Sequence, residues 1–458
     1  MTFRQALLAS ALVGVAAMTA PAASAQSFTD VLVAAYNNNP TLLAARAAQR
    51  ATDEGVPQAL SGWRPTVSVT GAVGKQTTDY SLQTSSTSDG STTPRSLSLT
   101  VSQPLYRGGR TEAATSSAEA LVLAGRQDLA NTEQSILLSA VTAYMDVVQD
   151  QAVLDLNRNN EEVLRRELDA TQERFRVGEI TRTDVAQAES RLSRATADRI
   201  SAEGALVSAR AVLARVIGEM PGTLKEPPPL PALPKNETEA LNIAYDENPL
   251  LLGAKYREDS AKYDVRSVSG ALLPTVSLNA SATRSEEQST THIDTDSAQV
   301  ALQLTVPLYE SGSVYSQTRQ RKQIYNQRRI QVEEQRRSVR QSVVQAWETL
   351  TTARSNIEAR KSQVQAAKVA LEGVQQEAEV GSRTTLDVLD QEQEYLDARV
   401  ALVQANRDEY VAGYSLLSSV GRLGAHQLNL PVEYYDPVGN YNRVRDKWFG
   451  TDGGLNVE

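Results

Sequence analysis

The chain of 458 residues contains no cysteine, only two histidines (His292 and His426) and four methionines. The absence of cysteine excludes disulfides, thiol catalysis and thiolate metal sites, and it also excludes a lipid anchor attached to an N-terminal cysteine. So few histidines and methionines argue against a histidine-based metal centre and against a methionine-rich copper site. We therefore expect neither a metal nor any other cofactor.

Aromatic residues make up 5% of the chain, and its net charge is −9. The acidic balance argues against a nucleic-acid partner, because phosphate binding requires a basic surface. We find no motif for a nucleophile–base pair, a metal cluster or a phosphate-binding loop, and Gly108-Gly109 fits a strand-to-helix turn better. The sequence therefore does not predict an enzyme, and its abundant Ala, Gln, Ser, Arg and Glu favour long polar helices over a compact core.

The first 25 residues have the features of an export signal. Arg4 supplies a positive charge, residues 6–17 form a short apolar run, and Ala23-Ser24-Ala25 forms a small-residue cleavage site before Gln26. A disordered N-terminus is the alternative. No later stretch reaches the roughly 18 consecutive apolar residues that a membrane-spanning helix needs. We expect the mature protein to begin near Gln26 and to work outside the cytoplasm.

The remainder of the chain consists of two repeats. Four landmarks occur twice in the same order, the first two 209 residues apart and the last two 203 residues apart. In the first repeat they are Ala35-Tyr36 with Asn39-Pro40, residues 65–69, Pro104-Leu105-Tyr106, and Val177-Gly178 with Thr183-Asp184-Val185. We divide the chain into a signal peptide (1–25), a first repeat (26–220), a proline-rich connector (221–238), a second repeat (239–424) and a C-terminal segment (425–458).

Each repeat contains two segments in which apolar residues alternate with small polar residues. They cover residues 65–77 and 95–106 in the first repeat, and 274–284 and 297–308 in the second. In the first segment, Val67 and Val69 alternate with Ser68 and Thr70, and this period of two predicts strands with one apolar face. Each strand would be about 10 residues long, which is enough to cross a bilayer when tilted, although an ordinary half-buried soluble sheet is the alternative. We expect the intervening polar residues to be exposed loops, at 78–93 and 285–296.

Six further segments show the periodicity of helices. They are 30–62, 111–175 and 183–218 in the first repeat, and 239–271, 313–379 and 384–421 in the second. In 313–379, apolar residues recur at positions a and d of a heptad repeat, for example Val343, Ala346, Leu350 and Ala353, with Arg360 as the exception. Such a seam predicts coiled-coil packing.

The helix lengths predict two parallel rods in each repeat. At about 1.5 Å per residue, each long helix would span roughly 100 Å, and each returning helix together with one N-terminal helix would span about the same length. Each repeat is then a tall two-rod coil that ends in a pair of strands. Four strands cannot close a barrel or cover their edges in lipid, whereas three copies would supply twelve strands, so we expect a homotrimer.

Each helix pair reverses direction far from the strands, around Gly178 and Gly381. Both glycines suit left-handed C-caps that allow a helix to turn back. Just after the second turn, Asp387 and Asp390 are three residues apart and share one helical face. In a trimer they would form rings of three carboxylates that favour cations in a narrow pore; alternatively, they stabilise the helix N-terminus through its dipole.

Three motifs resemble the TolC family of outer-membrane factors. They are residues 35–40 (AYNNNP), the two Pro-Leu-Tyr turns that are followed by glycine, and residues 380–390 (VGSRTTLDVLD). The resemblance covers essentially the whole mature chain, and its tail, residues 420–446, is similar to members that serve type I secretion. It implies a mainly α fold, with a long coiled-coil α-helical barrel and four β-strands per protomer that form a 12-stranded membrane barrel as a trimer. The connector and the C-terminal segment would form an equatorial belt.

The resemblance also implies a function and a location. It predicts a homotrimeric channel-tunnel in outer-membrane lipid that extends into the periplasm and exports proteins or small molecules, without an active site. A periplasmic adaptor (membrane fusion) protein and an inner-membrane ABC or RND-type pump would be its partners. Type I protein secretion is the expected process. Multidrug efflux is the alternative within the family, and a trimeric coiled-coil surface structural protein is the alternative from another class.

At the helix turns, the resemblance assigns roles to particular residues. Asp387 and Asp390 would line the closed periplasmic entrance, and Arg383 would contact Thr183 and Asp184, thereby tying neighbouring hairpins together. Relatives often have an aromatic residue five places before the arginine, where this chain has Ala378. The resulting lock is therefore expected to have fewer bonds.

Overall fold

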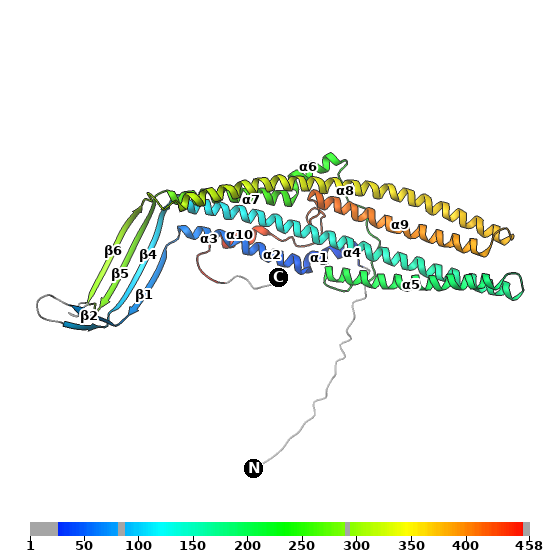
Figure 1. Ribbon diagram of the computed structural model, residues 1–458, viewed down its shortest axis with the longest axis horizontal. Coiled ribbons are helices and arrows are strands. Elements are labelled where there is room, and N and C mark those ends of the chain that lie inside the picture. The colour runs from blue at the N-terminus through cyan, green and yellow to red at the C-terminus, as the bar shows by residue number, and fades with distance from the viewer. Residues whose placement is uncertain (1–25, 81–87, 289–293, 452–458) are drawn as a thin grey trace, which may run out of the picture.

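The computed structural model describes residues 26–80, 88–288 and 294–451. The expected signal peptide lies outside the described residues, as do residues 81–87 and 289–293 of the expected loops. No helix in the three described ranges combines the length and the apolar character that crossing a membrane demands. This part of the chain forms an elongated set of helices with a sheet at one end (Figure 1).

Two 67-residue helices, α4 (Arg110–Arg176) and α8 (Ser313–Glu379), run along the long axis of the molecule. Each reverses into a 36-residue helix, α5 (Arg182–Ile217) or α9 (Thr385–Val420), and both turns lie at the end opposite the sheet (Figure 1). These bounds differ by at most one residue from the expected helices 111–175, 183–218, 313–379 and 384–421.

The heptad seam of α8 is buried as the sequence predicts. Val343, Ala346, Leu350 and Ala353 are all buried, whereas Arg360, the expected exception, is partly exposed. Alanine at the d positions allows neighbouring helices to approach closely, and the buried a and d side chains suit knobs-into-holes packing. The expected coiled-coil packing is therefore confirmed for this helix.

Both expected N-terminal helices are interrupted at an Asn-Pro pair. Residues 30–62 form α1 (Phe28–Asn38), α2 (Pro40–Asp53), α3 (Gly55–Leu60) and the 3-10 turn η1 (Ser61–Trp63). Residues 239–271 form α6 (Glu237–Glu247), α7 (Pro249–Ser269) and the 3-10 turn η2 (Gly270–Leu272). The prediction of one continuous helix is wrong in both repeats, because proline cannot donate to the preceding turn and disfavours helical backbone in the residue before it.

The two asparagines of these pairs join the short helices to the returning helices. Asn39 caps α2 by accepting a hydrogen bond from the N–H of Thr41 at 2.9 Å. Its side-chain nitrogen donates to the carbonyl of Val216, in the last turn of α5, at 3.0 Å. Asn248 repeats the arrangement at the start of α7 and donates to the carbonyl of Ser419 in α9 at 2.8 Å. One asparagine thus holds together the pieces of each composite rod.

The strands form two antiparallel sheets. The larger has the order β1-β4-β5-β6 and consists of β1 (Thr66–Val73), β4 (Arg95–Arg107), β5 (Thr275–Glu286) and β6 (Thr295–Thr305). Its central pair, β4 with β5, joins the two repeats. The smaller consists of β2 (Gln76–Tyr80) and β3 (Ser88–Thr92), so part of the segment 78–93 is strand and not loop. Threonine and tyrosine there have a β propensity that the polar composition obscured.

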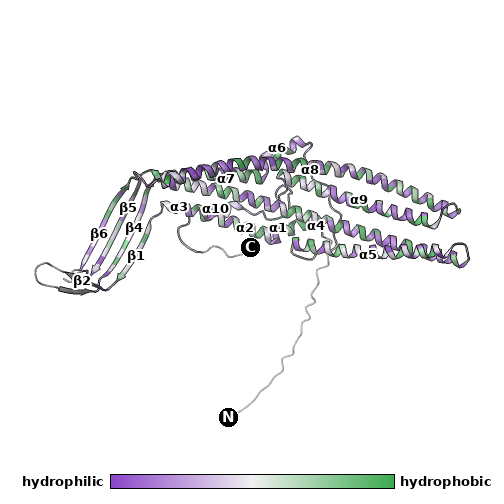
Figure 2. Cartoon of the chain, in the orientation of Figure 1, coloured by the Kyte–Doolittle hydropathy of each residue, from purple (hydrophilic) through white to green (hydrophobic). Residues whose placement is uncertain are grey.

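The two faces of the larger sheet differ in polarity, as the alternating colours along its strands show (Figure 2). On one face, apolar side chains are exposed, among them Val69 (66%) and Val300 (73%). On the other, Ser102 of β4 donates to Asn279 of β5 at 2.7 Å, within a row of small polar residues. An apolar face of this extent that is uncovered in the described protomer indicates an apolar environment or a partner.

The largest core lies midway along the helices, around Phe28 of α1. The Phe28 ring packs with centroid distances of 5.3–5.7 Å against Tyr144 of α4 and against Tyr410 and Tyr414 of α9. The Tyr410 hydroxyl donates to the carbonyl of Pro228 at 2.9 Å, and so it fixes the proline-rich connector across the helices.

The C-terminal segment folds back along α2. Asn440 of α10 (Pro437–Val444) donates to the buried Asp53 carboxylate at 2.8 Å, and the N–H of Tyr435 donates to the Tyr36 hydroxyl at 3.0 Å. These contacts between residues about 390 positions apart place the segment at the helical side of the junction with the sheet (Figure 1).

Candidate functional site

The two hairpin turns carry the residues that the sequence singles out. Gly178 (φ +81°) and Gly381 (φ +79°) adopt left-handed backbone, as expected. In the first turn, the N–H of Gly178 donates to the carbonyl of Phe175 at 3.0 Å. The N–H of Glu179 donates to the carbonyl of Arg174, also at 3.0 Å, and the second turn contains the equivalent pair. Both turns are Schellman motifs, in which a residue with a Cβ would be strained.

Each returning helix begins with a capping box. The Asp184 carboxylate accepts hydrogen bonds from the N–H and hydroxyl of Thr181 at 2.9 and 2.8 Å, and Asp387 accepts the same two from Thr384. The bonds from Thr384 lower the pKa of Asp387 below its ordinary value, so this carboxylate is charged at neutral pH. In both boxes the acceptor is Oδ2, and Oδ1 makes no hydrogen bond to another described residue.

Asp390 lies one helical turn after Asp387 and pairs with Arg191 of α5. We refer to these two residues as the inter-hairpin ion pair, because they join the second hairpin to the first. Next to Asp390 in the chain, Leu389 is buried against Leu164 and Ala195. Within one protomer, the hairpin tips are therefore held by an ion pair beside a small apolar cluster.

Arg383 does not make, within the protomer, the contact that the resemblance assigns to it. Its Nε donates to Glu377 Oε2 at 2.8 Å across its own turn, and this bond raises the pKa of the Arg383 guanidinium. Among the described residues, Arg383 bonds to neither Thr183 nor Asp184. The predicted link between neighbouring hairpins stays a prediction for an assembly, and the inter-hairpin ion pair is the link seen here.

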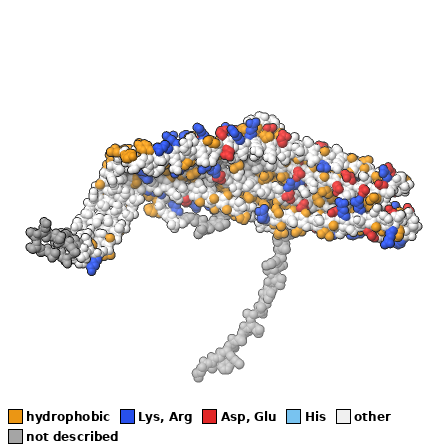
Figure 3. Space-filling model, in the orientation of Figure 1, with side chains coloured by type: hydrophobic (Ala, Val, Ile, Leu, Met, Phe, Trp, Pro, Cys, Tyr) orange, Lys and Arg blue, Asp and Glu red, His pale blue; other side chains and the backbone are white. Residues whose placement is uncertain are grey.

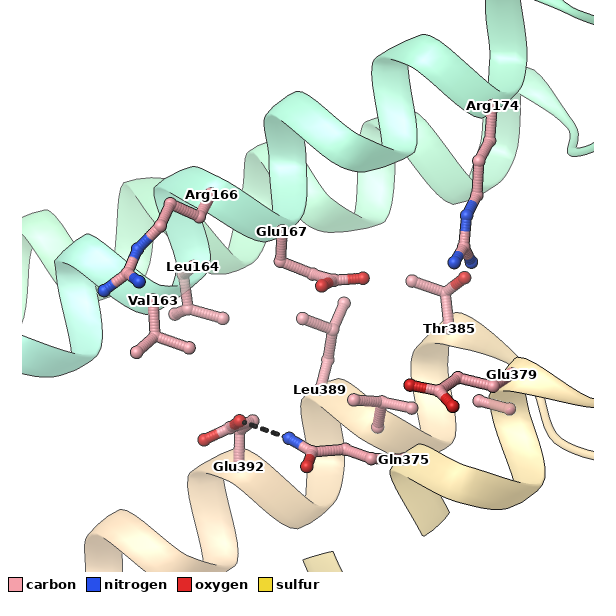
Figure 4. Close-up of a pocket in the computed structure, with 12 residues that line it drawn as sticks. Val163, Leu164, Arg166, Glu167, Arg174, Gln375, Glu379, Thr385, Leu389 and Glu392 are labelled. Atoms are coloured by element: carbon pink, nitrogen blue, oxygen red, sulfur yellow. Dashed lines mark hydrogen bonds between the residues drawn. The ribbon is translucent and has the colours of Figure 1, made fainter. Parts of the chain in front are cut away.

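A cavity of about 340 Å³ lies between α4 and the α8–α9 hairpin near the turns (Figure 4). Glu392 of α9 accepts a hydrogen bond from Gln375 of α8 at 3.1 Å, and Glu167 of α4 extends toward the same space from the other side. Burial and the charge of Glu167 raise the pKa of Glu392. Arg174 also lines the cavity but points toward Thr385. The hairpins thus meet here over a loosely packed, acidic space.

The model of the outer membrane efflux protein family matches residues 31–219 and 240–422, which is most of the chain. The chain belongs to this family. Similar proteins include the outer membrane efflux protein BepC of Brucella suis, which is 36% identical over 98% of this chain and 96% of its own length. The alkaline protease secretion protein AprF of Pseudomonas aeruginosa is 27% identical over 65% of this chain and 63% of its own length.

Among solved structures, the outer-membrane channel OprN has a TM-score of 0.75 and 21% identity, covering 86% of this chain and 89% of that one. This likeness confirms the expected TolC-like fold, mainly α with long helical hairpins; the larger sheet has the expected four strands, and β2 with β3 is an additional pair. The resemblance to the TolC family is confirmed as well. As a member of an outer membrane efflux family, the protein is located in the outer membrane and extends into the periplasm. The family is one of transport channels and not of enzymes.

Sequence reasoning missed Arg191, Glu392 and Glu167. Arg191 corresponds to Glu394 in the second repeat, and Asp390 corresponds to Gln187 in the first, at the offset of 203 residues. The charges of Arg191 and Asp390 are not repeated at the equivalent positions of the other repeat. This difference is a weak sign that the two residues make a contact that is not duplicated in this efflux-family protein. Their pairing depends on the register between α5 and α9, which no local pattern specifies.

Replacing Glu392 by Gln is expected to stabilise the hairpin tips at neutral pH and to have little effect at pH 4. The folded protein holds the Glu392 proton more tightly than the unfolded chain does. The contribution of this group to stability is therefore fully present below its ordinary pKa of 4.5 and is lost as pH rises through the raised folded value. Hydrogen exchange of amides in residues 380–395 should be slower in the variant at pH 7 and unchanged at pH 4.

The control for this prediction is Glu394→Gln, which alters an exposed carboxylate on the same helix. Equal protection by Glu392→Gln at both pH values would contradict this account.

Proposed function

We propose that three copies of the chain assemble into one channel-tunnel that exports proteins from an inner-membrane pump to the cell exterior. The larger sheet would contribute four strands from each copy to a 12-stranded barrel in the outer membrane. The helical hairpins would enclose a periplasmic tunnel whose entrance lies at the turns around Gly178 and Gly381. This architecture is a proposal for the assembly, supported by features of the single protomer.

The open edges of the larger sheet carry the proposal. Within the described chain, β1 pairs only with β4 and β6 pairs only with β5, so both outer strands have unpaired backbone groups. Their apolar side chains are also exposed, for example Val73 on β1 (74%) and Leu304 on β6 (64%). Lipid offers no hydrogen bonds, and each unsatisfied backbone group there costs several kcal/mol. Pairing β6 of one copy with β1 of the next satisfies both edges and leaves the apolar face toward lipid.

Mass determination tests this assembly directly. The protein purified in detergent should have three times the chain mass by native mass spectrometry, and the same preparation should form single channels in planar bilayers. A stable monomer, with no larger species in native membranes, would refute the proposal.

The carboxylates at the turns are proposed to form selectivity rings at the closed entrance. Asp387 is charged and has one oxygen without a hydrogen-bond partner in the described chain; the nearby Arg383 guanidinium bonds to Glu377 instead. Asp390, in contrast, is paired with Arg191. Three copies of Asp387 around one axis would attract cations and repel anions. The Asp387 ring should therefore dominate the ion selectivity of the closed channel.

Asp387→Asn is expected to lower the cation-to-anion permeability ratio severalfold, and Asp390→Asn is expected to lower it less. The permeability ratio of each variant is obtained from its reversal potential in a KCl gradient across a planar bilayer. An unchanged ratio in Asp387→Asn would remove this residue from the pore.

An adaptor and a pump are the proposed partners. The sequence contains no motif for a phosphate-binding loop with which the channel could hydrolyse a nucleotide itself. The proposed entrance is at the periplasmic end. A periplasmic adaptor protein and an inner-membrane ABC or RND-type pump would supply the energy and the cargo. Crosslinking the trimer in cells and identifying the captured inner-membrane proteins would name them.

Type I protein secretion is the proposed process, supported by the tail residues 420–446 and by the relationship to AprF, a protein named for protease secretion. Multidrug efflux is the second candidate, because the more similar BepC is named an efflux protein. Deletion of the gene separates them. Loss of particular secreted proteins with unchanged drug susceptibility supports secretion, whereas increased drug susceptibility with an unchanged secretome supports efflux.

A further inference from the structure

Exposed apolar side chains gather where the helices meet the larger sheet. We call Trp63, Leu105, Tyr106, Leu273, Leu308 and Tyr309 the junction belt; each lies at or within four residues of the helix-side end of a strand. Leu308 and Tyr309, which follow β6, are 91% and 79% exposed. Figure 3 shows apolar side chains at this junction and Lys and Arg side chains on the adjacent part of α8. Aromatic residues followed by basic residues are typical of a membrane–water interface.

The C-terminal segment returns to the level of this belt. Arg64, two residues before β1, donates from Nη1 to the carbonyl of Lys447 at 2.7 Å. The Arg64 guanidinium also lies over the Trp448 ring, 5.1 Å from its centroid. Trp448 and its neighbour Phe449 are 57% and 85% exposed. Trp448, from the far end of the chain, is therefore held largely uncovered just before the first strand, with the exposed Phe449 ring 6.5 Å from its own.

A cavity of about 1010 Å³ opens next to these aromatic residues, between α2 and the C-terminal segment. Arg50 of α2 and Arg443 of α10 line it together with Trp448 and Phe449. Lys447 also lines it, and the two acidic residues of the lining, Glu54 and Asp446, leave a surplus of one positive charge. An apolar rim beside cationic side chains suits a molecule with an anionic head and an apolar tail.

The C-terminal segment that lines this cavity is bonded to α2 and α4. Arg445 of the C-terminal segment pairs with Glu119 of α4 at 3.3 Å. The Tyr441 hydroxyl bonds to the same carboxylate at 3.3 Å, and the Asn440–Asp53 bond holds α10 to α2. The position of Trp448 and Phe449 is therefore set by α2 and α4 and not by the segment alone.

We infer that the C-terminal segment binds phospholipid of the periplasmic leaflet of the outer membrane. Trp448 and Phe449 lie among the headgroups and upper acyl chains, and Arg50 and Arg443 hold the phosphate of the headgroup. The inference rests on the proposed function, because it needs the larger sheet to cross the membrane. The segment would fix the height of the channel in the bilayer from outside the barrel strands.

Lipid is the occupant that the observations favour over a protein. Arg64, the neighbour of Trp63 in the junction belt, contacts Lys447 and Trp448 of the cavity lining. The belt adjoins an apolar sheet face whose neighbour in the proposed channel is lipid. The surplus positive charge of the lining complements a phosphodiester. A second copy or an adaptor covering Trp448 is the competing outcome in the test below.

Fluorescence quenching by brominated lipid tests the inference in the full-length protein. Trp63, Trp347 and Trp448 are the three tryptophans of the chain, so Trp63→Phe with Trp347→Phe leaves Trp448 as the sole reporter. In nanodiscs of phosphatidylethanolamine and phosphatidylglycerol, lipid brominated near the headgroup should quench Trp448 at least twofold, and lipid brominated near the chain end should quench it little. A variant that retains only Trp347, which lies on α8 within the helical part, should be quenched by neither.

A second reporter separates failure of this inference from failure of the proposed function. Val69→Trp, in a chain with all three native tryptophans replaced by Phe, places a reporter on the apolar sheet face. Quenching of this reporter by lipid brominated near the chain end, with no quenching of Trp448 by any lipid, would overturn the inference and leave the channel proposal intact. If neither reporter is quenched, the sheet does not cross the membrane and both fail.

The inferred contacts of Arg50 and Arg443 with the lipid phosphate are tested by a separate measurement of lipid affinity. Titration of the detergent-solubilised protein with phosphatidylglycerol, followed by native mass spectrometry, should show at least threefold weaker binding for Arg50→Gln with Arg443→Gln. The control, Arg158→Gln with Arg354→Gln, removes the same charge from exposed sites far from the cavity and should bind as the unaltered protein does. Equal weakening in both double variants would overturn the assignment of Arg50 and Arg443.

Discussion

Lysine in place of Val300 is expected to remove most of the protein from the outer membrane as an assembled channel. Val300 is at the centre of β6, and its side chain is 73% exposed on the apolar face. A lysine facing lipid at mid-bilayer costs about 2–4 kcal/mol, so three copies in one trimer would cost about 6–12 kcal/mol. A free-energy change of that size is comparable to the whole folding stability of a typical protein, about 5–15 kcal/mol. The amount of trimer in outer-membrane fractions, run on a semi-native gel, measures the effect.

Gln299→Lys is the matched control for this substitution. Gln299 precedes Val300 in β6 and therefore projects from the opposite, polar face, where a charge would remain in water. It should assemble nearly as well as the unaltered chain. Equal tolerance of lysine at both positions would show that the apolar face does not contact lipid.

Removal of both charged contacts at the hairpin tips is expected to raise single-channel conductance. Arg191→Gln breaks the inter-hairpin ion pair, and Arg383→Ser removes the bond to Glu377 together with any link to Asp184 in a neighbouring hairpin. Exposed ion pairs contribute about 0.2–1 kcal/mol each, so two in each of three protomers sum to roughly 3 kcal/mol. That corresponds to about a hundredfold shift from closed toward open channels. Planar-bilayer recordings of the double variant measure the shift.

Two further variants show whether charge or contact is responsible. Arg166→Gln with Arg176→Gln removes two arginines whose ion pairs, among the described residues, stay within α4, and it should leave conductance unchanged. Exchange of the two charges, Arg191→Asp with Asp390→Arg, re-forms the inter-hairpin ion pair in the opposite sense. This variant should be closed more often than one in which the pair is broken. Asp184→Ala would not isolate the link, because Asp184 also caps α5 through Thr181. Low conductance in the Arg191→Gln, Arg383→Ser variant would contradict the proposed lock.

Long-helix bounds were predictable from the sequence because their determinants are local. Gly178 ends the first hairpin helix in left-handed backbone, which glycine enters without the strain that other residues would suffer there. Thr181 and Asp184 start the next helix through bonds between residues three positions apart. The alternation of Val67 and Val69 with Ser68 and Thr70 likewise reports which face of a strand is apolar. Both repeats carry the same signals, so each repeat supports the helix and strand assignments of the other.

Other features were misread although their cause stood in the sequence. Asn39-Pro40 and Asn248-Pro249 mark helix boundaries, yet the apolar periodicity on both sides suggested one helix across each pair. The reason for their exact position is not local. Each asparagine also bonds to the end of a returning helix about 170 or more residues away, at Val216 or Ser419.

The sequence by itself determined the long helices, the strand faces, the duplication and the family of this outer-membrane protein, because each depends on residues within a few turns of one another or on recognisable motifs. Only the tertiary structure decided that Asp390 pairs with Arg191, that Glu392 and Glu167 share a cavity, and that Trp448 returns to the edge of the sheet. These contacts depend on how segments that are about 200 or more residues apart pack against one another. A side chain on an exposed helical face has many possible partners in sequence, and the three-dimensional arrangement selects one of them.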